Sequence, residues 1–258
     1  MTHPWFDGVA TPRVLAHRGL VTPEAQRSGI AENSFAAVAA AHSAGVHYVE
    51  SDCHRTADGV VVLFHDDDLT RVTGDPRRIS DVPLRELEDL MAERGGLITL
   101  TQALASFPTV RFNLDVKATD AASAVGTAVA PFADRVLLTS FSDERRRAAL
   151  AAAHAAARGQ RPATSAGRGT IARVLAAVAA RSDRLVAKSL AGIDALQVPE
   201  RQRGLRFLTP RLIAAAHRHG VEVHVWTVND PDQMLRLVEM KVDGIVTDRA
   251  DVALATLS

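Results

Sequence analysis

The chain has 258 residues, of which 47% are hydrophobic and 23% are charged. A chain of this length buries roughly three quarters of the surface that its unfolded form exposes, as globular proteins do. Thirty basic residues balance thirty acidic ones, so the strongly basic character of a dedicated nucleic-acid binder is missing and no nucleic-acid partner is expected. The single cysteine, Cys53, excludes an intrachain disulfide and any cysteine-cluster metal site.

The sequence shows no sign of membrane insertion or secretion. No apolar run approaches 18 residues, and residues 1–8 lack the basic and then apolar layout of a secretory signal. We therefore expect a cytoplasmic protein without stable membrane anchoring. The oligomeric state is left open.

Short apolar runs alternate with longer helical patterns along the whole chain. The runs are rich in Val, Leu and Ile, as in the strands of a parallel sheet that helices cover. Eight runs are predicted as strands: 14–17, 47–52, 111–117, 135–140, 162–165, 195–198, 222–228 and 244–247. Eight strand–helix units predict an α/β protein, a (β/α)8 TIM barrel built as a single domain over residues 1–258. A doubly wound open sheet is the alternative.

Helix start signals support this alternation. Asn33 is predicted to cap a helix, and Thr209 and Asp230 each precede a proline, which is typical of the first turn of a helix. The alanine-rich segments 143–158 and 168–181 are helical by propensity. The helices therefore fall between the predicted strands, as a barrel requires.

One stretch interrupts the alternation. Charged and turn-forming residues fill the segment from about 66 to 98, which we interpret as a small insertion after the second strand. Neither the P-loop nor the G-x-G-x-x-G fingerprint occurs in the chain. Nothing in the sequence therefore indicates a nucleotide cofactor.

Catalytic groups of a barrel enzyme lie at the carboxyl ends of its strands. Among the ten histidines, two satisfy this rule best: His17 ends the first predicted strand, and His65 ends the apolar run 60–65. An imidazole titrates near neutral pH, so it can serve as a general acid or a general base. His17 and His65 are therefore the candidate catalytic histidines.

Acidic side chains at a spacing of two occur on the second and third strands. Glu50 and Asp52 project from one face of a strand with their Cα atoms roughly 6.5 Å apart, and Asp115 and Lys117 repeat this geometry. Several anions at one barrel mouth are costly without a cation, and the oxygen-only set of Glu50, Asp52 and Asp115 suits Mg²⁺ or Ca²⁺. An ion-pair cluster of carboxylates with Lys117 is the alternative.

Three further side chains are candidates for ligand contact. Arg18 follows His17 and offers a guanidinium to phosphate or carboxylate oxygens. Lys117 is one of only three lysines against 27 arginines, which indicates that this position requires a compact ammonium group. Trp226 ends the seventh strand, where it forms either a pocket wall or part of the core.

These motifs together resemble the glycerophosphodiester phosphodiesterase family. They span about residues 14–250 in the family's order: Ala16-His17-Arg18-Gly19, Glu32-Asn33-Ser34, Glu50-Ser51-Asp52, Thr56-Ala57-Asp58-Gly59, His65-Asp66, Asn113-Leu114-Asp115-Val116-Lys117, Trp226-Thr227-Val228-Asn229 and Asp243-Gly244-Ile245-Val246-Thr247-Asp248. The resemblance implies a (β/α)8 barrel with a small insertion after strand two. It also implies hydrolysis of glycerophosphodiesters to glycerol 3-phosphate and an alcohol, with one divalent cation, Mg²⁺ or Ca²⁺.

The resemblance assigns a role to each matching position. The implied roles are an acid–base pair of His17 and His65, phosphate ligands Arg18 and Lys117, and metal ligands Glu50, Asp52 and Asp115. Trp226 is predicted to contact the substrate because of its place at a strand end, and not from the resemblance. Two positions depart from the family pattern: Asp115 stands where many members have glutamate, and Lys241 stands where a glycine commonly closes a helix. A left-handed conformation of Lys241 would cost on the order of 1 kcal/mol.

Two other functions stay open at this point. A lysophospholipase D-like phosphodiesterase acting on lipids would need an apolar surface near the barrel mouth. A barrel that binds phosphoesters without hydrolysing them is the non-enzymatic alternative, and the presence of both histidines and the acidic set argues against it. The nucleophile, water or a neighbouring substrate hydroxyl, and the order of the two histidines are also open.

Overall fold

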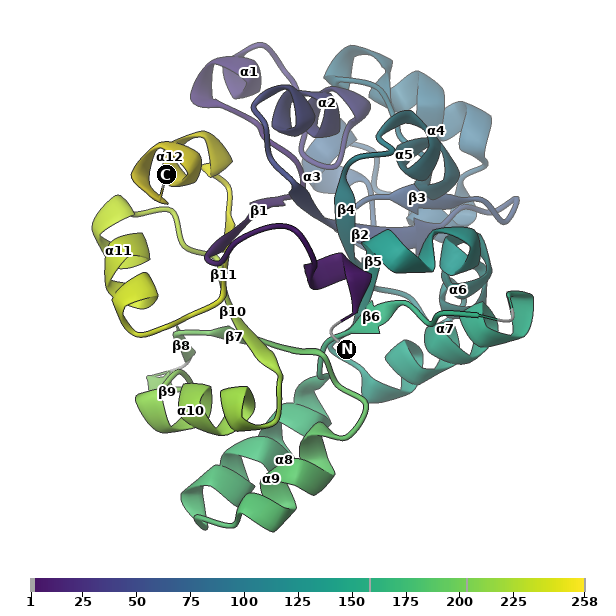
Figure 1. Ribbon diagram of the computed structural model, residues 1–258. Coiled ribbons are helices and arrows are strands. Elements are labelled where there is room, and N and C mark those ends of the chain that lie inside the picture. The colour runs from purple at the N-terminus through teal and green to yellow at the C-terminus, as the bar shows by residue number, and fades with distance from the viewer. Residues whose placement is uncertain (1–2, 158, 203, 258) are drawn as a thin grey trace.

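The computed structural model describes residues 3–157, 159–202 and 204–257. Eight parallel strands form a barrel that helices surround (Figure 1). The barrel strands are β1 Arg13–His17, β2 Tyr48–Arg55, β4 Arg111–Val116, β5 Val136–Thr139, β6 Ala163–Thr164, β7 Ala195–Pro199, β10 Glu222–Trp226 and β11 Gly244–Thr247. The predicted (β/α)8 barrel is confirmed, and each predicted strand coincides with one of these.

Strand pairing runs around the barrel in the order β6, β5, β4, β2, β1, β11, β10, β7. A parallel bridge between Ser165 and Ala195 joins the two ends of this path. Beside it, the Asp194 N–H donates to the Thr164 carbonyl at 2.9 Å, and the Ala166 N–H donates to the Ala195 carbonyl at 3.1 Å. This junction excludes the open, doubly wound sheet.

Helices cover the outside of the barrel. They are α1 Pro23–Arg27, α2 Phe35–Ser43, α5 Leu100–Ser106, α6 Ala122–Val129, α7 Asp143–Ala156, α8 Arg168–Ala179, α9 Asp183–Leu190, α10 Pro210–Arg218, α11 Pro231–Glu239 and α12 Ala250–Leu257. The alanine-rich segments form α7 and α8 as predicted. Helix α9 and the strands β8 Arg201–Gln202 and β9 Leu205–Arg206 were not predicted, and the two-residue strands are too short for a periodic signal. None of the helices in the described residues has the length and apolarity needed to traverse a bilayer.

The cap of α2 differs from the prediction. Ser34, not Asn33, is the N-cap, and its hydroxyl accepts a backbone hydrogen bond in the first turn. Asn33 adopts a left-handed φ of 56°, and its amide donates to Asp52 Oδ2 at 3.1 Å. Asn33 and Ser34 could both cap α2. Because Asn33 hydrogen-bonds to the buried carboxylate of Asp52, Ser34 is the cap. Thr209 and Asp230 cap α10 and α11 as predicted.

Between β2 and α5 the chain leaves the barrel. Strand β3 Val61–Leu63 pairs antiparallel with β2, and α3 Thr70–Thr73, the 3₁₀ turn Ile79–Asp81, α4 Leu84–Met91 and the 3₁₀ turn Ala92–Arg94 follow. These elements pack around their own apolar cluster of Val62, Phe64, Leu69, Ile79, Val82, Leu87, Met91 and Leu97. They correspond to the insertion predicted at about 66–98, which begins earlier than expected because β3 belongs to it.

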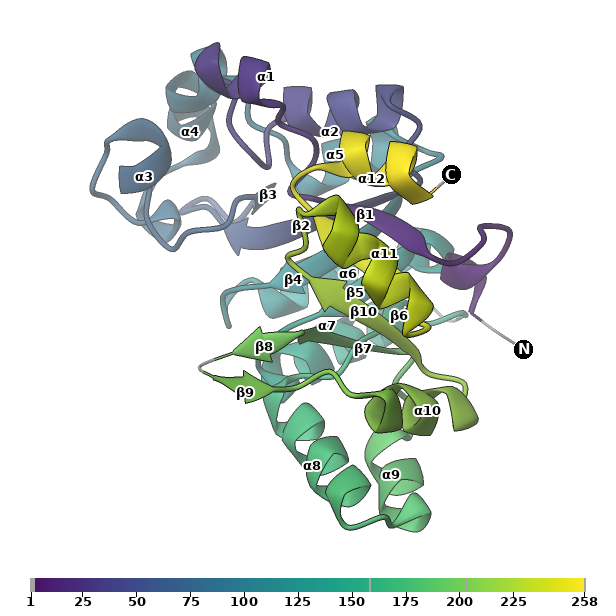
Figure 2. The same cartoon turned by 90° about the vertical axis from the view of Figure 1, so that its left-hand side faces the viewer.

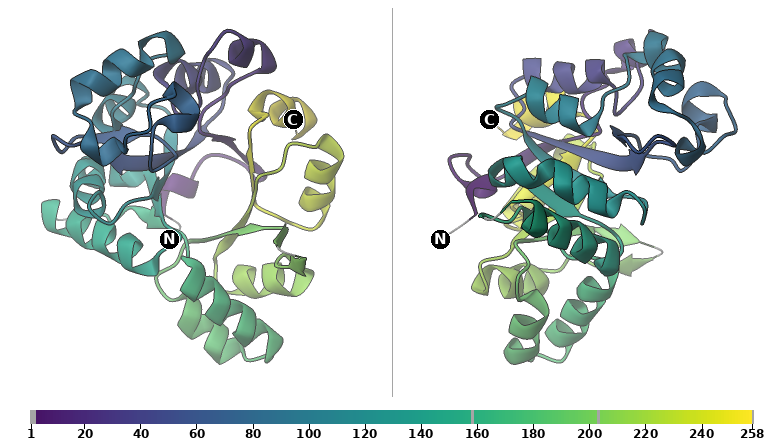
Figure 3. Two further views of the ribbon diagram at one scale, coloured as in Figure 1. Left: turned by 180° about the vertical axis from the view of Figure 1, so that it is seen from behind. Right: turned by 90° about the vertical axis from the view of Figure 1, so that its right-hand side faces the viewer.

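The sequence-based prediction that His65 ends a barrel strand is therefore wrong. It follows β3, which turns back along β2, and the Phe64 N–H donates to the Asp52 carbonyl at 2.9 Å. The hairpin thus returns the chain to the level of the barrel mouth. Figures 2 and 3 show the insertion on the side of the barrel opposite the N-terminus.

The amino end of the barrel is filled by side chains. Trp5, in the 3₁₀ turn Pro4–Phe6, is fully buried, and its Nε1 donates to the Phe112 carbonyl at 3.1 Å. Arg13 pairs with both oxygens of Glu222 at 2.9 and 2.7 Å and donates to the Tyr48 hydroxyl at 2.8 Å. The base is therefore packed and cross-linked, in keeping with a site at the opposite end.

Lys241 has the left-handed conformation considered from the sequence, with φ at 69°. It follows α11, where its N–H donates to the Val238 carbonyl at 2.8 Å and the Val242 N–H donates to the Leu237 carbonyl at 3.1 Å. This hydrogen-bond pattern ends a helix with a residue in the region that favours glycine.

We expect Lys241→Gly to raise the free energy of unfolding by about 1 kcal/mol, because glycine has no Cβ to clash in this conformation. For a domain of this size the melting temperature should rise by about 2–4 °C. Lys241→Ala is the control, since alanine removes the charge but keeps the Cβ. Equal melting temperatures of Lys241→Gly and Lys241→Ala would contradict this explanation.

Candidate active site

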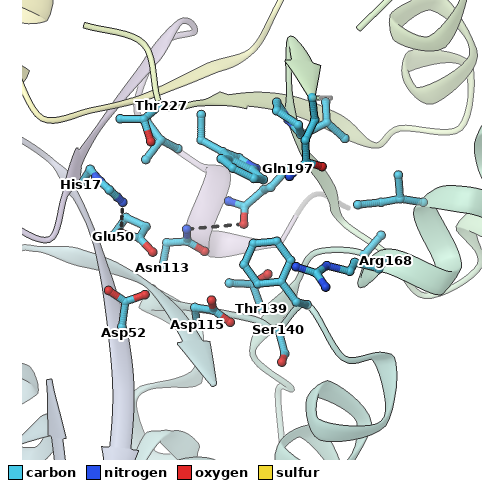
Figure 4. A pocket seen from close by; sticks show the side chains of 18 of the residues that line it. His17, Glu50, Asp52, Asn113, Asp115, Thr139, Ser140, Arg168, Gln197 and Thr227 are labelled. Carbon is cyan, nitrogen blue, oxygen red and sulfur yellow. Dashed lines mark hydrogen bonds and ion pairs between the residues drawn. The ribbon is translucent and has the colours of Figure 1, made fainter. Parts of the chain in front are cut away.

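A cavity of about 420 Å³ lies at the carboxyl ends of the barrel strands (Figure 4). All eight side chains singled out from the sequence line it: His17, Arg18, Glu50, Asp52, His65, Asp115, Lys117 and Trp226. They come from β1, β2, β4, β10, the residues just beyond these strands, and the insertion. The fold thus gathers residues that are up to 209 positions apart around one space.

Strand register sorts the polar side chains into two levels. His17 lies beside Glu50, and Glu50 lies beside Asn113. Two residues further along the strands, Asp52 lies beside Asp115. Because strands alternate their side chains and neighbours lie about 4.8 Å apart, the three acidic groups necessarily face the same space.

Lys117 lies between two of these carboxylates. Its Nζ is 2.9 Å from Asp52 Oδ1 and 2.7 Å from Asp115 Oδ2. Burial alone would lower the pKa of Lys117, but the two carboxylates outweigh it and raise the pKa above its ordinary value. Burial would likewise raise the pKa of Asp52, yet Lys117 and Arg18 lower it. Lys117 and Asp52 are therefore a charged pair at neutral pH.

Glu50 is compensated less, because the charges of His17 and Lys117 lower its pKa without outweighing the effects that raise it. Burial raises its pKa, and the negative charge of Asp52 raises it further, to about 8. Burial also raises the pKa of Asp115, against the opposing charge of Lys117. Glu50 Oε2 and Asp115 Oδ1 are buried without a hydrogen-bond partner. The cavity therefore holds more buried carboxylate than its own cations satisfy.

This excess of carboxylate is what a hard cation would neutralise. Two unpartnered buried oxygens and an all-oxygen donor set fit Mg²⁺ or Ca²⁺ chemically. In the described part of the chain, however, no three His, Cys, Asp or Glu side chains are arranged closely enough to form a metal cluster. Both oxygens of Asp52 are engaged, by Lys117, Asn33 and Arg18.

His17 is oriented by an aspartate that sequence reasoning did not single out. Its Nδ1 is 2.6 Å from Asp248 Oδ1, while its Nε2 is 3.8 Å from Glu50 Oε2. An ionised carboxylate only accepts hydrogen bonds, so Nδ1 carries the proton and Nε2 is directed into the cavity. Burial would lower the pKa of His17, but Asp248 and Glu50 raise it. Asp248 follows β11, so the strand-end rule was a signal that could have found it.

His65 has the same arrangement on the insertion side. Its Nδ1 is 2.6 Å from Asp66 Oδ1, and Asp66 Oδ2 accepts from Arg71 Nε at 2.6 Å. Arg71 in turn contacts Glu32 Oε1 at 2.6 Å, and Arg18 Nη1 donates to that same oxygen at 2.7 Å. A continuous chain of ion pairs therefore links His65 to Arg18 through α3 of the insertion.

The other side of the cavity is apolar. Trp226 lines it, and its ring packs against Phe141 with centroids 5.8 Å apart at 90°. Trp226 therefore forms a pocket wall, which was one of the two positions predicted for it from the sequence. Further lining residues that the sequence did not reveal are Ala166, Arg168, Ile171, Ala172, Leu175, Val198, Pro199 and Phe207. Those on α8 or in loops carry no sequence signal for the cavity, whereas Val198 and Pro199 end β7, where the strand-end rule could have found them.

Comparison with known proteins shows to which family the chain is related. Residues 17–252 match the model of the glycerophosphoryl diester phosphodiesterase family. A probable glycerophosphodiester phosphodiesterase 2 of Mycobacterium tuberculosis is 35% identical over 244 residues, covering 92% of this chain and 88% of that protein. A lysophospholipase D of Homo sapiens is 33% identical over 100 residues, covering 33% of this chain and 32% of that protein.

Solved structures share the fold. A putative glycerophosphoryl diester phosphodiesterase from Silicibacter pomeroyi has a TM-score of 0.72 at 22% identity, with 99% of this chain and 97% of that chain covered. An Oleispira antarctica phosphodiesterase in complex with the product sn-glycerol-3-phosphate has a TM-score of 0.70 at 22% identity, with 96% and 97% covered. The fold and the family match define an enzyme of the barrel phosphodiesterase class. Within that class, the chain belongs to the glycerophosphoryl diester phosphodiesterase family.

Proposed function

We propose that the enzyme hydrolyses glycerophosphodiesters to glycerol 3-phosphate and an alcohol by acid–base catalysis with two histidines. The observation that carries this proposal is the matched pair of imidazoles on one cavity, each with Nδ1 held by an aspartate at 2.6 Å. With each Nδ1 engaged by an aspartate, Nε2 is the ring nitrogen that remains available to a ligand. The related Mycobacterium tuberculosis protein and the product bound to the Oleispira antarctica enzyme support the substrate class.

The two histidines divide the proton transfers. His17 Nε2 accepts the proton of the attacking hydroxyl as its oxygen bonds to phosphorus. His65, in its protonated form, donates a proton to the leaving oxygen as the other P–O bond breaks. The hydrogen bond of each Nδ1 to an aspartate stabilises the imidazolium that this exchange requires. The nucleophile is water or a neighbouring substrate hydroxyl, which would first give a cyclic phosphate.

Arg18 and Lys117 are the proposed phosphate ligands. Both line the cavity beside the histidines, and both are held by carboxylates: Arg18 by Glu32 at 2.7 Å and Lys117 by Asp115 at 2.7 Å. Side chains held in place in this way stabilise negative charge on the phosphoryl oxygens without reorganising during the reaction.

Glu50, Asp52 and Asp115 are the proposed ligands of one divalent cation, Mg²⁺ or Ca²⁺. The unpartnered oxygens of Glu50 and Asp115 support this assignment for those two residues, whereas Asp52 would have to exchange one of its present partners for the ion. When bound, such an ion would supply Lewis-acid polarisation of a phosphoryl oxygen.

Replacing either His17 or His65 with alanine should lower kcat at least about a hundredfold, because each variant loses one proton transfer. Release of glycerol 3-phosphate from glycerophosphocholine measures this. His154→Ala is the control, since His154 lies exposed on α7 outside the cavity. Near-full activity of both cavity variants, with unchanged melting temperatures, would rule out the histidine mechanism.

The variant Glu50→Gln tests the proposed cation site through its effect on the free energy of unfolding. The folded protein keeps the Glu50 proton up to about pH 8, whereas the unfolded chain loses it near the ordinary pKa of 4.5. Wild-type stability should therefore fall as the pH rises from 4.5 to 8, and the variant should lack this loss. In EDTA at pH 8, a gain of about 2 kcal/mol would raise the variant's melting temperature by about 4–8 °C above that of the wild type.

Addition of Mg²⁺ or Ca²⁺ should then stabilise the wild type and restore its activity after EDTA treatment, but stabilise Glu50→Gln far less. Glu88→Gln is the control, because Glu88 is exposed on α4 and makes no contact with the cavity. An equal response of wild type and Glu50→Gln to both cations would exclude Glu50 as a ligand.

A second candidate function is hydrolysis of lysophospholipids, which the apolar wall of the cavity favours. Ile171, Leu175, Phe207 and Trp226 line one side of it and offer contact to an alkyl chain. The partial similarity to a human lysophospholipase D points the same way. Such a substrate differs from a glycerophosphodiester only by the chain that this wall would bury.

Leu175→Asn should lower kcat/KM for lysophosphatidylcholine, relative to glycerophosphocholine, at least about tenfold, since each buried methylene contributes about 0.8 kcal/mol. Choline release measures both reactions. Leu185→Asn is the matched control, because Leu185 is 49% exposed on α9 and lies outside the cavity. No choline release from the lysophospholipid by the wild type would eliminate this second function.

A further inference from the structure

One face of α8 lines the cavity and carries a single charge. The lining residues of this helix are Arg168, Ile171, Ala172 and Leu175. Their spacing of three and four residues places them on one side of an α-helix. Arg168 therefore heads an otherwise apolar stripe that faces the cavity, and Figure 4 shows it across the cavity from His17.

Arg168 is held in place by Phe141. Its guanidinium carbon lies 4.5 Å from the centroid of the Phe141 ring, and its backbone N–H donates to the Phe141 carbonyl at 3.0 Å. Lys117 Nζ lies 5.5 Å from the same ring centroid. These two distances mean that Arg168 Cζ lies at most 10.0 Å from Lys117 Nζ. A single small molecule could therefore place an anionic group near Arg168 and a phosphate at Lys117.

Among the described residues, the guanidinium of Arg168 has no ion-pair partner. Every other cationic or imidazole side chain that lines the cavity has a carboxylate partner: Arg18, Lys117, His17 and His65. Over residues 3–157, 159–202 and 204–257, no ion pair to Arg168 occurs. Arg168 therefore offers its guanidinium N–H groups to a ligand.

We propose that Arg168 and Phe141 form a subsite for an anionic group, a carboxylate or a phosphate, on the alcohol part of the substrate. This inference rests on the proposed hydrolysis of glycerophosphodiesters. The glycerol part of such a substrate carries only hydroxyls, so a second negative charge can reside only on the alcohol. A guanidinium matches the planar oxygens of a carboxylate or a phosphate with two parallel hydrogen bonds.

The same subsite disfavours a cationic alcohol such as choline. A quaternary ammonium binds best to an aromatic face that no other cation occupies. The ring of Phe141 already has Lys117 and Arg168 against it. A third positive charge there would be repelled by both, so anionic alcohols should be preferred over neutral ones and neutral ones over choline.

The test compares three glycerophosphodiesters whose alcohols are similar in length: 3-hydroxypropionate, glycerol and choline. Release of glycerol 3-phosphate gives kcat/KM for each, and the ratio of the anionic to the cationic substrate is the readout. Arg168→Gln should lower this ratio about tenfold, the loss of one charge-assisted contact. Arg168→Glu should lower it further, and Arg168→Lys should keep most of it.

Arg173→Gln is the matched control. Arg173 lies on the same helix, is exposed and contacts Thr170, but does not line the cavity. Its removal changes the net charge equally and should leave the ratio unchanged. A second measurement needs no variant: because Arg168 is exposed, raising NaCl from about 0.05 to 0.5 M should lower the wild-type ratio several-fold by screening.

The outcomes separate the two proposals. Hydrolysis by the wild type with equal rates for all three alcohols, insensitive to Arg168→Gln and to salt, would overturn the subsite and leave the proposed function standing. No hydrolysis of any of the three would overturn the proposed function and the subsite together. An equal loss of the ratio in Arg168→Gln and Arg173→Gln would show a general charge effect and would also overturn the subsite.

Discussion

The ammonium group of Lys117 between Asp52 and Asp115 is the contact on which the site depends. Three carboxylates converge because parallel strands of fixed register present them at the barrel mouth, and mutual repulsion would oppose folding there. Lys117 satisfies two of them at 2.9 and 2.7 Å. Glu50 is left over, and its raised pKa records the remaining excess of negative charge. The same strand register thus gives an ion-paired Lys117 and a buried Glu50 without an equal opposing charge.

The insertion is part of this site and not an appendage to the barrel. It contributes His65 and Asp66, and its helix α3 carries Arg71, which bridges Asp66 to Glu32. Glu32 in turn contacts Arg18. The insertion has an apolar cluster of its own, so it can hold these side chains firmly while packing against the barrel edge along β2. Ion pairs across separate segments thus connect the second histidine to the residue that follows the first.

The cavity is divided between two kinds of chemistry. Charged side chains come from β1, β2, β4 and the insertion, whereas α8, Phe141 and Trp226 supply apolar walls. Under the proposed function, the charged side would bind and cleave the phosphodiester, and the apolar side, with Arg168 at its edge, would discriminate among the groups attached to the phosphate. The proposed reaction and the proposed selectivity then reside on different elements, as in barrels whose loops vary over a constant set of strands.

Much of this could be predicted from local patterns. Runs of Val, Leu and Ile marked the strands, spacings of two placed Glu50 with Asp52 and Asp115 with Lys117 on common faces, and strand ends indicated His17. Periodicity and alternation are properties of the chain over a few residues, so these features needed no coordinates.

The rest depended on contacts between distant segments. The pairing of His17 with Asp248 spans 231 residues, and Asn33 serves Asp52 instead of capping α2. The direction of β3, which places His65, and the side of α8 that meets the cavity were likewise settled only by packing. Local sequence determines which face a side chain occupies, whereas barrel closure and burial determine what that face meets.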